Sequence, residues 1–302
     1  MKHLLSIEAL ARDEIYEVLD LAESLKASRG RHTFLPLAGQ CWALIFSKSS
    51  TRTRVSFEVG IRELGGAVMF LSANDIQLGR GEPIEDTARV MGRMLDGAVI
   101  RTFLQSDVET FAQYSQIPTV NALTDDEHPC QILADLQTIR ELMGSLEGRC
   151  VCFVGDGACN VAASWIWAAA KLDIELRIAS PQGFQPNPSL LERARRTGRV
   201  LVFDDPLEAA RGADVLYTDV WVSMGKETEA AERMAALANF QINEALTAVA
   251  APGALVMHCL PAYRGKEITA ETFEAHAQTL FDQAENRLHA QKAILQLIAH
   301  RA

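Results

Sequence analysis

Short apolar runs alternate with segments of helical spacing along the chain. In the first half, four runs predict strands, at residues 41–46, 67–71, 98–101 and 119–122. Helices are predicted from Leu10 to Lys26 and from Glu85 to Met94, because apolar residues recur there every three or four positions. Strands that alternate with helices are typical of βαβ units and a parallel sheet.

The pattern restarts after the glycine-containing segment 143–148. Five further runs predict strands, at residues 150–154, 174–179, 200–203, 214–218 and 254–258. The last predicted element is a helix from Ala284 to Ala302. A length of 302 residues fits two domains of ordinary size. The predicted fold class is therefore α/β, with two doubly wound parallel-sheet domains over residues 1–142 and 143–283.

The junction after the first predicted strand carries the most informative chemistry. Four polar residues stand where a helix is predicted to begin, Ser50, Thr51, Arg52 and Thr53. Ser50 is a good N-cap, and the free N–H groups and dipole of a helix start favour an anion. Arg52 adds a guanidinium that fits phosphate oxygens. The segment indicates a phosphate site without the pattern of a nucleotide P-loop. Taken alone, it also fits an ordinary capped helix with exposed arginines.

Two further segments place polar side chains beside predicted elements. His128 and Gln131 flank Pro129 at a predicted helix start, where an imidazole and a carboxamide can hold a small planar group. Alone, this segment favours a capped helix with a satisfied histidine. Cys259 directly follows the predicted strand 254–258, and open α/β sheets bind ligands at the carboxyl ends of their strands. Cys259 there fits a nucleophile, a polar lining residue or an inert buried thiol.

Five motifs together make the chain similar to a known family. They are Ser50-Thr51-Arg52-Thr53, His128-Pro129-x-Gln131, Asp219-x-x-x-Ser223-Met224-Gly225, His258-Cys259-Leu260-Pro261 and Glu285-Asn286-Arg287. Over essentially its whole length the chain resembles the aspartate/ornithine carbamoyltransferases, and the third and fourth motifs point to the ornithine-specific members. The resemblance implies transfer of the carbamoyl group of carbamoyl phosphate to the δ-amine of L-ornithine, which gives L-citrulline and phosphate in arginine metabolism. It implies no metal and no cofactor, and an active site in the cleft between the two domains.

The resemblance assigns carbamoyl phosphate to the domain 1–142, completed by the C-terminal helix 284–302. The implied contacts are Ser50, Thr51, Arg52, Thr53, Gln77, Arg101, His128, Gln131, Cys259, Leu260 and Arg287. Arg101 is implied to bridge the phosphate and the carbonyl oxygen, His128 to donate to that oxygen, and Gln131 to accept from the carbamoyl NH₂. Arg287 adds positive charge. The implied catalytic residues are Arg101, His128, Cys259 and Arg287, and preorganised donors of this kind stabilise an oxyanion in the transition state.

The domain 143–283 is implied to bind ornithine. The matching residues are Asn160, Asp219, Ser223 and Met224. The first two match residues that hold the α-carboxylate and α-ammonium, and the last two belong to a loop that closes over ornithine in the family. Cys259 and the Leu260 carbonyl are implied to orient the δ-amine; which group takes its proton stays open. The chain departs from the family at Cys159, where a second asparagine is common.

Gln77 bears on assembly. In the family its loop reaches the phosphate site of a neighbouring subunit, so the resemblance implies a shared active site in a homotrimer or a multiple of trimers. Considered by itself, Gln77 is an ordinary polar loop residue.

Composition limits the kinds of partner and the cellular compartment that we expect for this protein. A net charge of −10 argues against a nucleic-acid-binding surface, and no apolar run approaches the roughly 20 residues of a membrane span. The first residues resemble neither a secretory signal nor a transit peptide. The six cysteines fit no Cys-x-x-Cys metal spacing, so we expect reduced thiols in a cytoplasmic protein.

Particular residues argue against three alternative functions: a dinucleotide-dependent enzyme, a carbamoyltransferase with another acceptor, and a non-catalytic binding protein. Gly155-Asp156-Gly157 resembles the start of a dinucleotide fingerprint, but Asn160 stands where its third glycine is required. Putrescine, N-acetylornithine or aspartate as acceptor would keep the carbamoyl site. The Ser-Met-Gly loop argues against a diamine, Asp219 argues against an acetylated α-amine, and aspartate would call for a more basic acceptor loop than Lys226 alone provides. A non-catalytic binding protein is disfavoured by five residues that are all present, Arg52, Arg101, His128, Gln131 and Cys259. The metabolic direction does not follow from the sequence.

Overall fold

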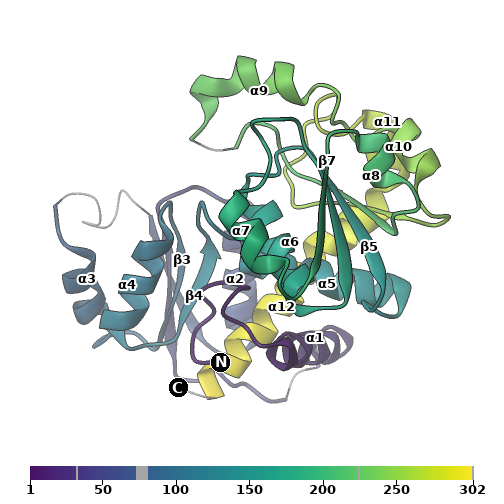
Figure 1. Ribbon diagram of the computed structural model, residues 1–302. Helices are drawn as coiled ribbons and strands as arrows, with labels where there is room; N and C mark the ends of the chain where they lie inside the picture. Colours follow the sequence, from purple (N-terminus) through teal and green to yellow (C-terminus); the bar gives the residue numbers. More distant parts are fainter. Residues whose placement is uncertain (32, 73–80, 224, 301–302) are drawn as a thin grey trace. The chain divides into compact units, whose positions relative to one another are not determined.

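The computed structural model describes residues 1–31, 33–72, 81–223 and 225–300. The chain divides into two compact units, Met1–Gln137 with Asn286–Ala302, and Thr138–Glu285 (Figure 1). Over the described residues, each unit is built on one parallel sheet, with four strands in the first and five in the second. The predicted fold class, two parallel-sheet α/β units, is therefore confirmed. The domain limits 142 and 283 stay predictions beside these contact-based limits.

The sheet of the first unit has the order β2-β1-β3-β4. Its strands are β1 (Cys41–Phe46), β2 (Ala67–Ser72), β3 (Gly97–Arg101) and β4 (Thr119–Leu123). The two central strands are almost wholly buried, which explains their unbroken apolar sequences. The strand order reverses between β1 and β3, so the chain after Phe46 and the side chain of Arg101 meet at one switch point, where Ser47 N–H donates to the Arg101 carbonyl at 2.8 Å.

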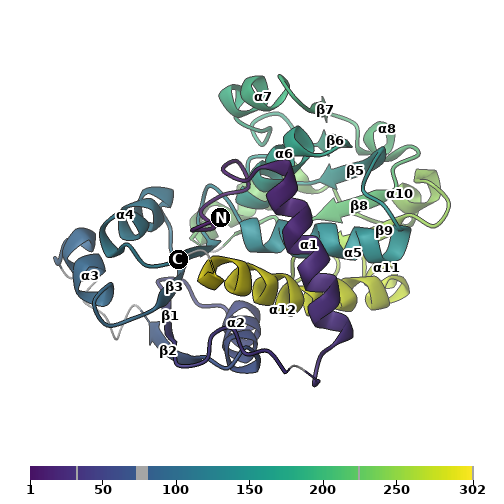
Figure 2. The ribbon, with the colours of Figure 1, turned by 90° about the horizontal axis from the view of Figure 1, so that it is seen from below.

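Six of the described helices contribute to the first unit. They are α1 (Arg12–Ala27), α2 (Thr51–Glu63), α3 (Ile84–Met91), α4 (Gln105–Ser115), the start of α5 (Pro129–Met143) and the end of α12 (Ala277–His300). Figure 2 shows α1 crossing α12, and the two helices line one pocket. The prediction that a helix continues to Met94 is wrong: α3 ends at Met91, and the chain then forms turns, in which the Arg93 N–H donates to the Val90 carbonyl at 3.1 Å and the Met94 N–H to the Met91 carbonyl at 3.0 Å.

The sheet of the second unit has the order β7-β6-β5-β8-β9. Its strands are β5 (Arg149–Val154), β6 (Ile174–Ala179), β7 (Arg199–Phe203), β8 (Val215–Thr218) and β9 (Leu255–His258). Its order reverses between β5 and β8, and the segments that follow these strands carry Asn160 and Asp219. These two candidate ornithine contacts therefore belong to one switch point, the place where open sheets bind ligands.

Helices surround this second sheet. They are α6 (Asn160–Lys171), α7 (Pro188–Ala194), α8 (Pro206–Ala210), the 3₁₀ turn η1 (Glu227–Glu229), α9 (Ala230–Leu237), α10 (Glu244–Val249) and α11 (Ala270–Ala275). The last predicted helix starts seven residues too late, since α12 already begins at Ala277 and buries Leu280. None of the described helices has the length and apolar character of a bilayer-spanning segment.

Candidate active site

The start of α2 has the form of an anion site. Ser50 is its N-cap, as predicted: its Oγ accepts from the Thr53 N–H at 3.3 Å and donates to the Thr53 Oγ1 at 2.9 Å. The first turn holds no acidic residue, so nothing there opposes an anion. Thr53 is buried, Arg52 half-buried and Thr51 exposed. The free N–H groups of this turn and the Arg52 guanidinium are donors suited to phosphate oxygens.

Buried cations from distant segments gather near this turn. Arg287, on α12, donates from Nη2 to the Thr53 Oγ1 at 2.7 Å. Arg101 is the last residue of β3 and is 5% exposed. Burial, followed by the charges of Arg287 and Arg101, holds the pKa of His128 well below its usual range. His128 is therefore a neutral imidazole near neutral pH, inside a positively charged part of the first unit.

Gln131 and Cys130 lie on the first turn of α5, and both are buried. Gln131 donates from Nε2 to the Asp135 Oδ1 at 2.8 Å, while its Oε1 accepts from none of the described residues. A buried carboxamide oxygen of this kind is suited to an N–H donor on a ligand. Cys130 donates to the Asn121 carbonyl at 3.3 Å, and burial raises the pKa of its thiol to about 12, so it stays protonated.

Lys48 is a neighbour of this site that the sequence analysis missed. It is 7% exposed, forms a short ion pair with Asp125, and its ammonium lies 4.2 Å from the centroid of the Phe103 ring. The only signal in the sequence was a lysine between a strand end and an N-cap, which is usually an exposed residue.

In the second unit, Asp219 and Cys259 are in contact. Asp219 follows β8, and its Oδ1 accepts from the Val220 N–H at 2.7 Å and from the Cys259 thiol at 2.9 Å. Burial raises the pKa of Asp219 above its usual value. The carboxyl end of β8 thus carries a carboxylate beside a thiol, which brings a residue expected at the α-groups of ornithine into contact with one expected at its δ-amine.

The His258 side chain is hydrogen-bonded to the backbone of Leu260, which follows Cys259. Its Nδ1 accepts from the Leu260 N–H at 2.8 Å, so Nε2 carries the ring proton and donates to the Glu267 Oε1 at 3.2 Å. His258 and Glu267 are both fully buried, and Leu260 has a left-handed φ of 56°. These bonds hold Leu260 in a backbone conformation that L-residues rarely adopt.

Asn160 is the first residue of α6 and is half-buried; the N-cap is Cys159, whose Sγ accepts from the Ala162 N–H at 3.4 Å. Ser223 is half-buried in the segment after β8. Two other candidates, Gln77 and Met224, lie outside the described residues.

Within the described part of the chain, one cluster offers donors to a metal ion. Asp219, His258 and Cys259 each place a potential ligand atom within 4.8 Å of the others. Both ring nitrogens of His258 are already engaged by Leu260 and Glu267, so ligation would require one of these hydrogen bonds to break.

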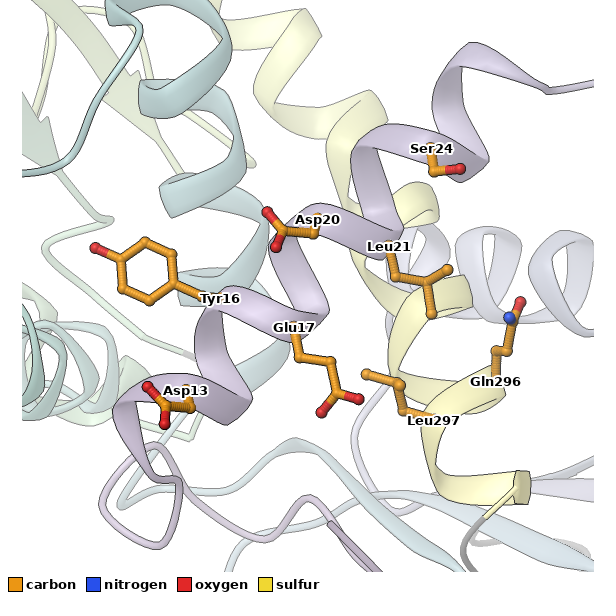
Figure 3. Close-up of a pocket in the computed structure, with 8 residues that line it drawn as sticks. All are labelled: Asp13, Tyr16, Glu17, Asp20, Leu21, Ser24, Gln296 and Leu297. Carbon is orange, nitrogen blue, oxygen red and sulfur yellow. The ribbon is translucent and has the colours of Figure 1, made fainter.

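A separate pocket of about 630 Å³ lies on the first unit. It is lined by α1 and α12 through Asp13, Tyr16, Glu17, Asp20, Leu21, Ser24, Gln296 and Leu297 (Figure 3). Its carboxylates give it the opposite charge preference to the start of α2, and it includes none of the candidate residues.

Comparison with known proteins places the chain in a family. The family model for the carbamoyl-phosphate-binding domain of aspartate/ornithine carbamoyltransferases matches residues 2–141, and that for the Asp/Orn-binding domain matches residues 147–298. The chain belongs to the aspartate/ornithine carbamoyltransferase family.

Its relatives are similar over almost their whole length. An ornithine carbamoyltransferase of Akkermansia muciniphila is 57% identical over 99% of this chain and 98% of the relative. One from Nitrosococcus oceani is 50% identical over 97% and 96%. Among solved structures, that of the Pyrococcus furiosus ornithine carbamoyltransferase has a TM-score of 0.94 at 42% identity, covering 100% of this chain and 98% of the other. The anabolic enzyme of Campylobacter jejuni has a TM-score of 0.94 at 39% identity, with both chains fully covered.

Proposed function

We propose that this protein is an ornithine carbamoyltransferase, which forms L-citrulline and phosphate from carbamoyl phosphate and L-ornithine. Its curated relatives carry that name at 48–57% identity. The single structural observation that carries the proposal is the bond from Arg287 to Thr53 beside the neutral, buried His128. It joins a cation, a helix start and an uncharged donor, which suit an acyl phosphate, in which the phosphate is bonded directly to a reactive carbonyl carbon.

In the first unit, the phosphate binds the start of α2. The proposed contacts are Ser50, Thr51, Arg52, Thr53 and Arg287. Arg101 bridges the phosphate and the carbonyl oxygen, and the neutral His128 donates an N–H to that oxygen as it gains charge. The buried Oε1 of Gln131 accepts from the carbamoyl NH₂, which supports the role expected for this residue.

In the second unit, the acceptor amino acid is held by Asn160, Asp219, Ser223 and Met224. The Cys259 thiol and the Leu260 carbonyl orient the δ-amine. The amine attacks the carbonyl carbon as a neutral nucleophile; the new C–N bond replaces the C–O bond to phosphate, and the amine gives up one proton. Because a free alkylamine has a pKa of about 10, the site must favour the neutral form of the ornithine δ-amine.

The assembly is a homotrimer or a multiple of trimers, with Gln77 reaching a neighbouring active site. Exposed apolar side chains on the first unit support an interface there: Val55 on α2 is 54% exposed, and Met69 on β2 is 47% exposed. Strand β2 also forms an edge of its sheet, so an open edge and apolar groups occur together.

We place the protein in the cytoplasm and its product in arginine biosynthesis. All six cysteines are free thiols, which fits a reducing compartment. The anabolic name of the Campylobacter jejuni relative supports the biosynthetic direction.

The test is product formation from carbamoyl phosphate with L-ornithine, putrescine, N-acetyl-L-ornithine and L-aspartate offered separately. We expect citrulline from L-ornithine alone. An Arg101→Ala variant purified in the same way controls for a contaminating host enzyme and should lose turnover. Turnover of a different acceptor would overturn the ornithine assignment, and turnover of none would overturn the enzymatic one.

A further inference from the structure

Arg233 is a buried charge that the proposed chemistry does not use. It lies on α9, its side chain is 6% exposed, and nothing in the sequence patterns singles it out. A buried guanidinium is costly unless every charge and donor nearby is well paired. Its contacts therefore indicate what it does for the second unit.

Those contacts reach three segments besides its own helix. Nη1 donates to the Asp156 Oδ2 at 2.7 Å and to the Trp221 carbonyl at 3.2 Å. The guanidinium also lies 5.2 Å from the centroid of the Phe184 ring. Asp156 follows β5, Phe184 follows β6 and Trp221 follows β8, so one side chain joins the carboxyl ends of three adjacent strands.

Two of these segments carry the candidate acceptor contacts. Asp156 lies four residues before Asn160. Trp221 lies midway between Asp219 and Ser223. The fourth partner, Glu229, accepts from Nε at 2.9 Å but is half exposed, so it can be lost with less consequence than Asp156.

The first segment has additional support. The Ser180 Oγ donates to the Gly155 carbonyl at 2.8 Å and accepts from the Gly157 N–H at 3.1 Å. The described bonds of Ser223 and Gly225 are local, to Lys226 and to Glu227. Arg233 thus connects the segment after β8, whose described hydrogen bonds are local, to the segment after β5, which is also hydrogen-bonded to Ser180.

Arg233 also compensates a charge. Burial is the largest cause of the raised pKa of the Cys159 thiol, and the negative charges of Asp219 and Asp156 raise it further. The Asp156 carboxylate is therefore within electrostatic reach of the residue next to Asn160. Without Arg233 it would be a buried, uncompensated anion beside the proposed site of an α-carboxylate, which it would repel.

We propose that Arg233 is a positioning residue for the amino-acid end of the acceptor. Through Asp156 and the Trp221 carbonyl it fixes Asn160 relative to the Asp219–Ser223 segment, and it neutralises Asp156. It touches no substrate. The inference rests on the proposed function, since it concerns the ornithine half of that site.

The test is steady-state kinetics of Arg233→Gln with each substrate varied. We expect the KM for ornithine to rise about tenfold or more, with kcat changed by less than about threefold and the KM for carbamoyl phosphate unchanged. The inhibition constant of L-norvaline, which has the α-groups but no δ-amine, should rise in parallel. Arg196→Gln is the matched control, because it removes an exposed ion pair with Glu192 from the same unit.

A second variant separates charge compensation from general damage. Adding Asp156→Asn to Arg233→Gln removes the uncompensated carboxylate, so the double variant should recover part of the ornithine affinity. If Arg233→Gln does not fold, Arg233→Lys keeps the charge and should show a smaller rise.

An ornithine KM within twofold of wild type in the folded variant, or an equal rise for both substrates, would overturn the role of Arg233. Failure of the proposed function would appear separately, as absence of citrulline formation by the wild-type protein.

Discussion

Arg287 and Thr53 lie 234 positions apart in the chain and are joined by a 2.7 Å hydrogen bond from Nη2 to Oγ1. Both side chains are buried, and Thr53 is also bonded to the N-cap Ser50. The orientation of the α2 start and that of the α12 cation are therefore coupled. A substitution at either end of the bond should alter phosphate binding more than folding.

Arg287→Gln should raise the KM for carbamoyl phosphate about tenfold or more and leave the KM for ornithine unchanged, because it removes a charged donor from the proposed phosphate site. Initial rates with each substrate varied give both values. Arg62→Gln is a suitable control, since it changes an exposed arginine at the other end of α2. Equal effects of the two substitutions would contradict the assignment.

His128 should make stability sensitive to acid. Burial and the two arginines lower its pKa in the folded state, so below about pH 6.5 the unfolded chain binds a proton that the folded chain does not. Stability therefore falls as pH decreases below that value, with a contribution from His128 of up to about 1.4 kcal/mol per pH unit. Well above pH 6.5 the imidazole is neutral in both the folded and the unfolded state, so the contribution of His128 no longer changes with pH.

The measurement is urea unfolding at several pH values between 5 and 7.5. A His128→Asn variant should lose less stability than wild type across this interval. Parallel stability profiles of the two proteins would show that His128 titrates normally.

Asp219→Ala should raise the ornithine requirement more than any change in the first unit. It removes the carboxylate that accepts from the Cys259 thiol and that is proposed to bind the α-groups of the acceptor. Rates measured over a wide range of ornithine concentrations test this. An unchanged KM for ornithine would remove Asp219 from the acceptor site.

Cys159 acts as a cap, and this gives a stability prediction. Its thiol accepts from the Ala162 N–H, and burial and the carboxylates of Asp219 and Asp156 raise its pKa so that it remains neutral. Cys159→Ala should cost about 1 kcal/mol of unfolding free energy, whereas Cys159→Ser supplies a better cap and should cost less. Denaturant unfolding of the three proteins compares them; equal losses for both variants would exclude the capping role.

Local chemistry made much of this structure predictable. The strands were found because buried parallel strands have unbroken apolar sequences, and the Ser50 cap because the hydroxyl and its N–H partner lie three residues apart. Long-range ion pairs left no such signal: Arg233 and Asp156 are 77 positions apart, Arg233 belongs to no recognisable pattern, and the pattern that includes Asp156 does not indicate its partner. The early start of α12 was missed because its first turns contain several polar residues, so their apolar face is weak in the sequence.

The last helix has a consequence for biosynthesis. Residues 286–300 belong to the first unit, although the ribosome makes them after the entire second unit. Until they emerge, the nascent first unit lacks Arg287 and the buried Lys292, whose ammonium pairs with the Glu63 Oε2 at 2.7 Å. The second unit can complete its sheet while the chain is still attached, but the first unit must wait, with the surface that α12 covers exposed to chaperones and to other nascent chains.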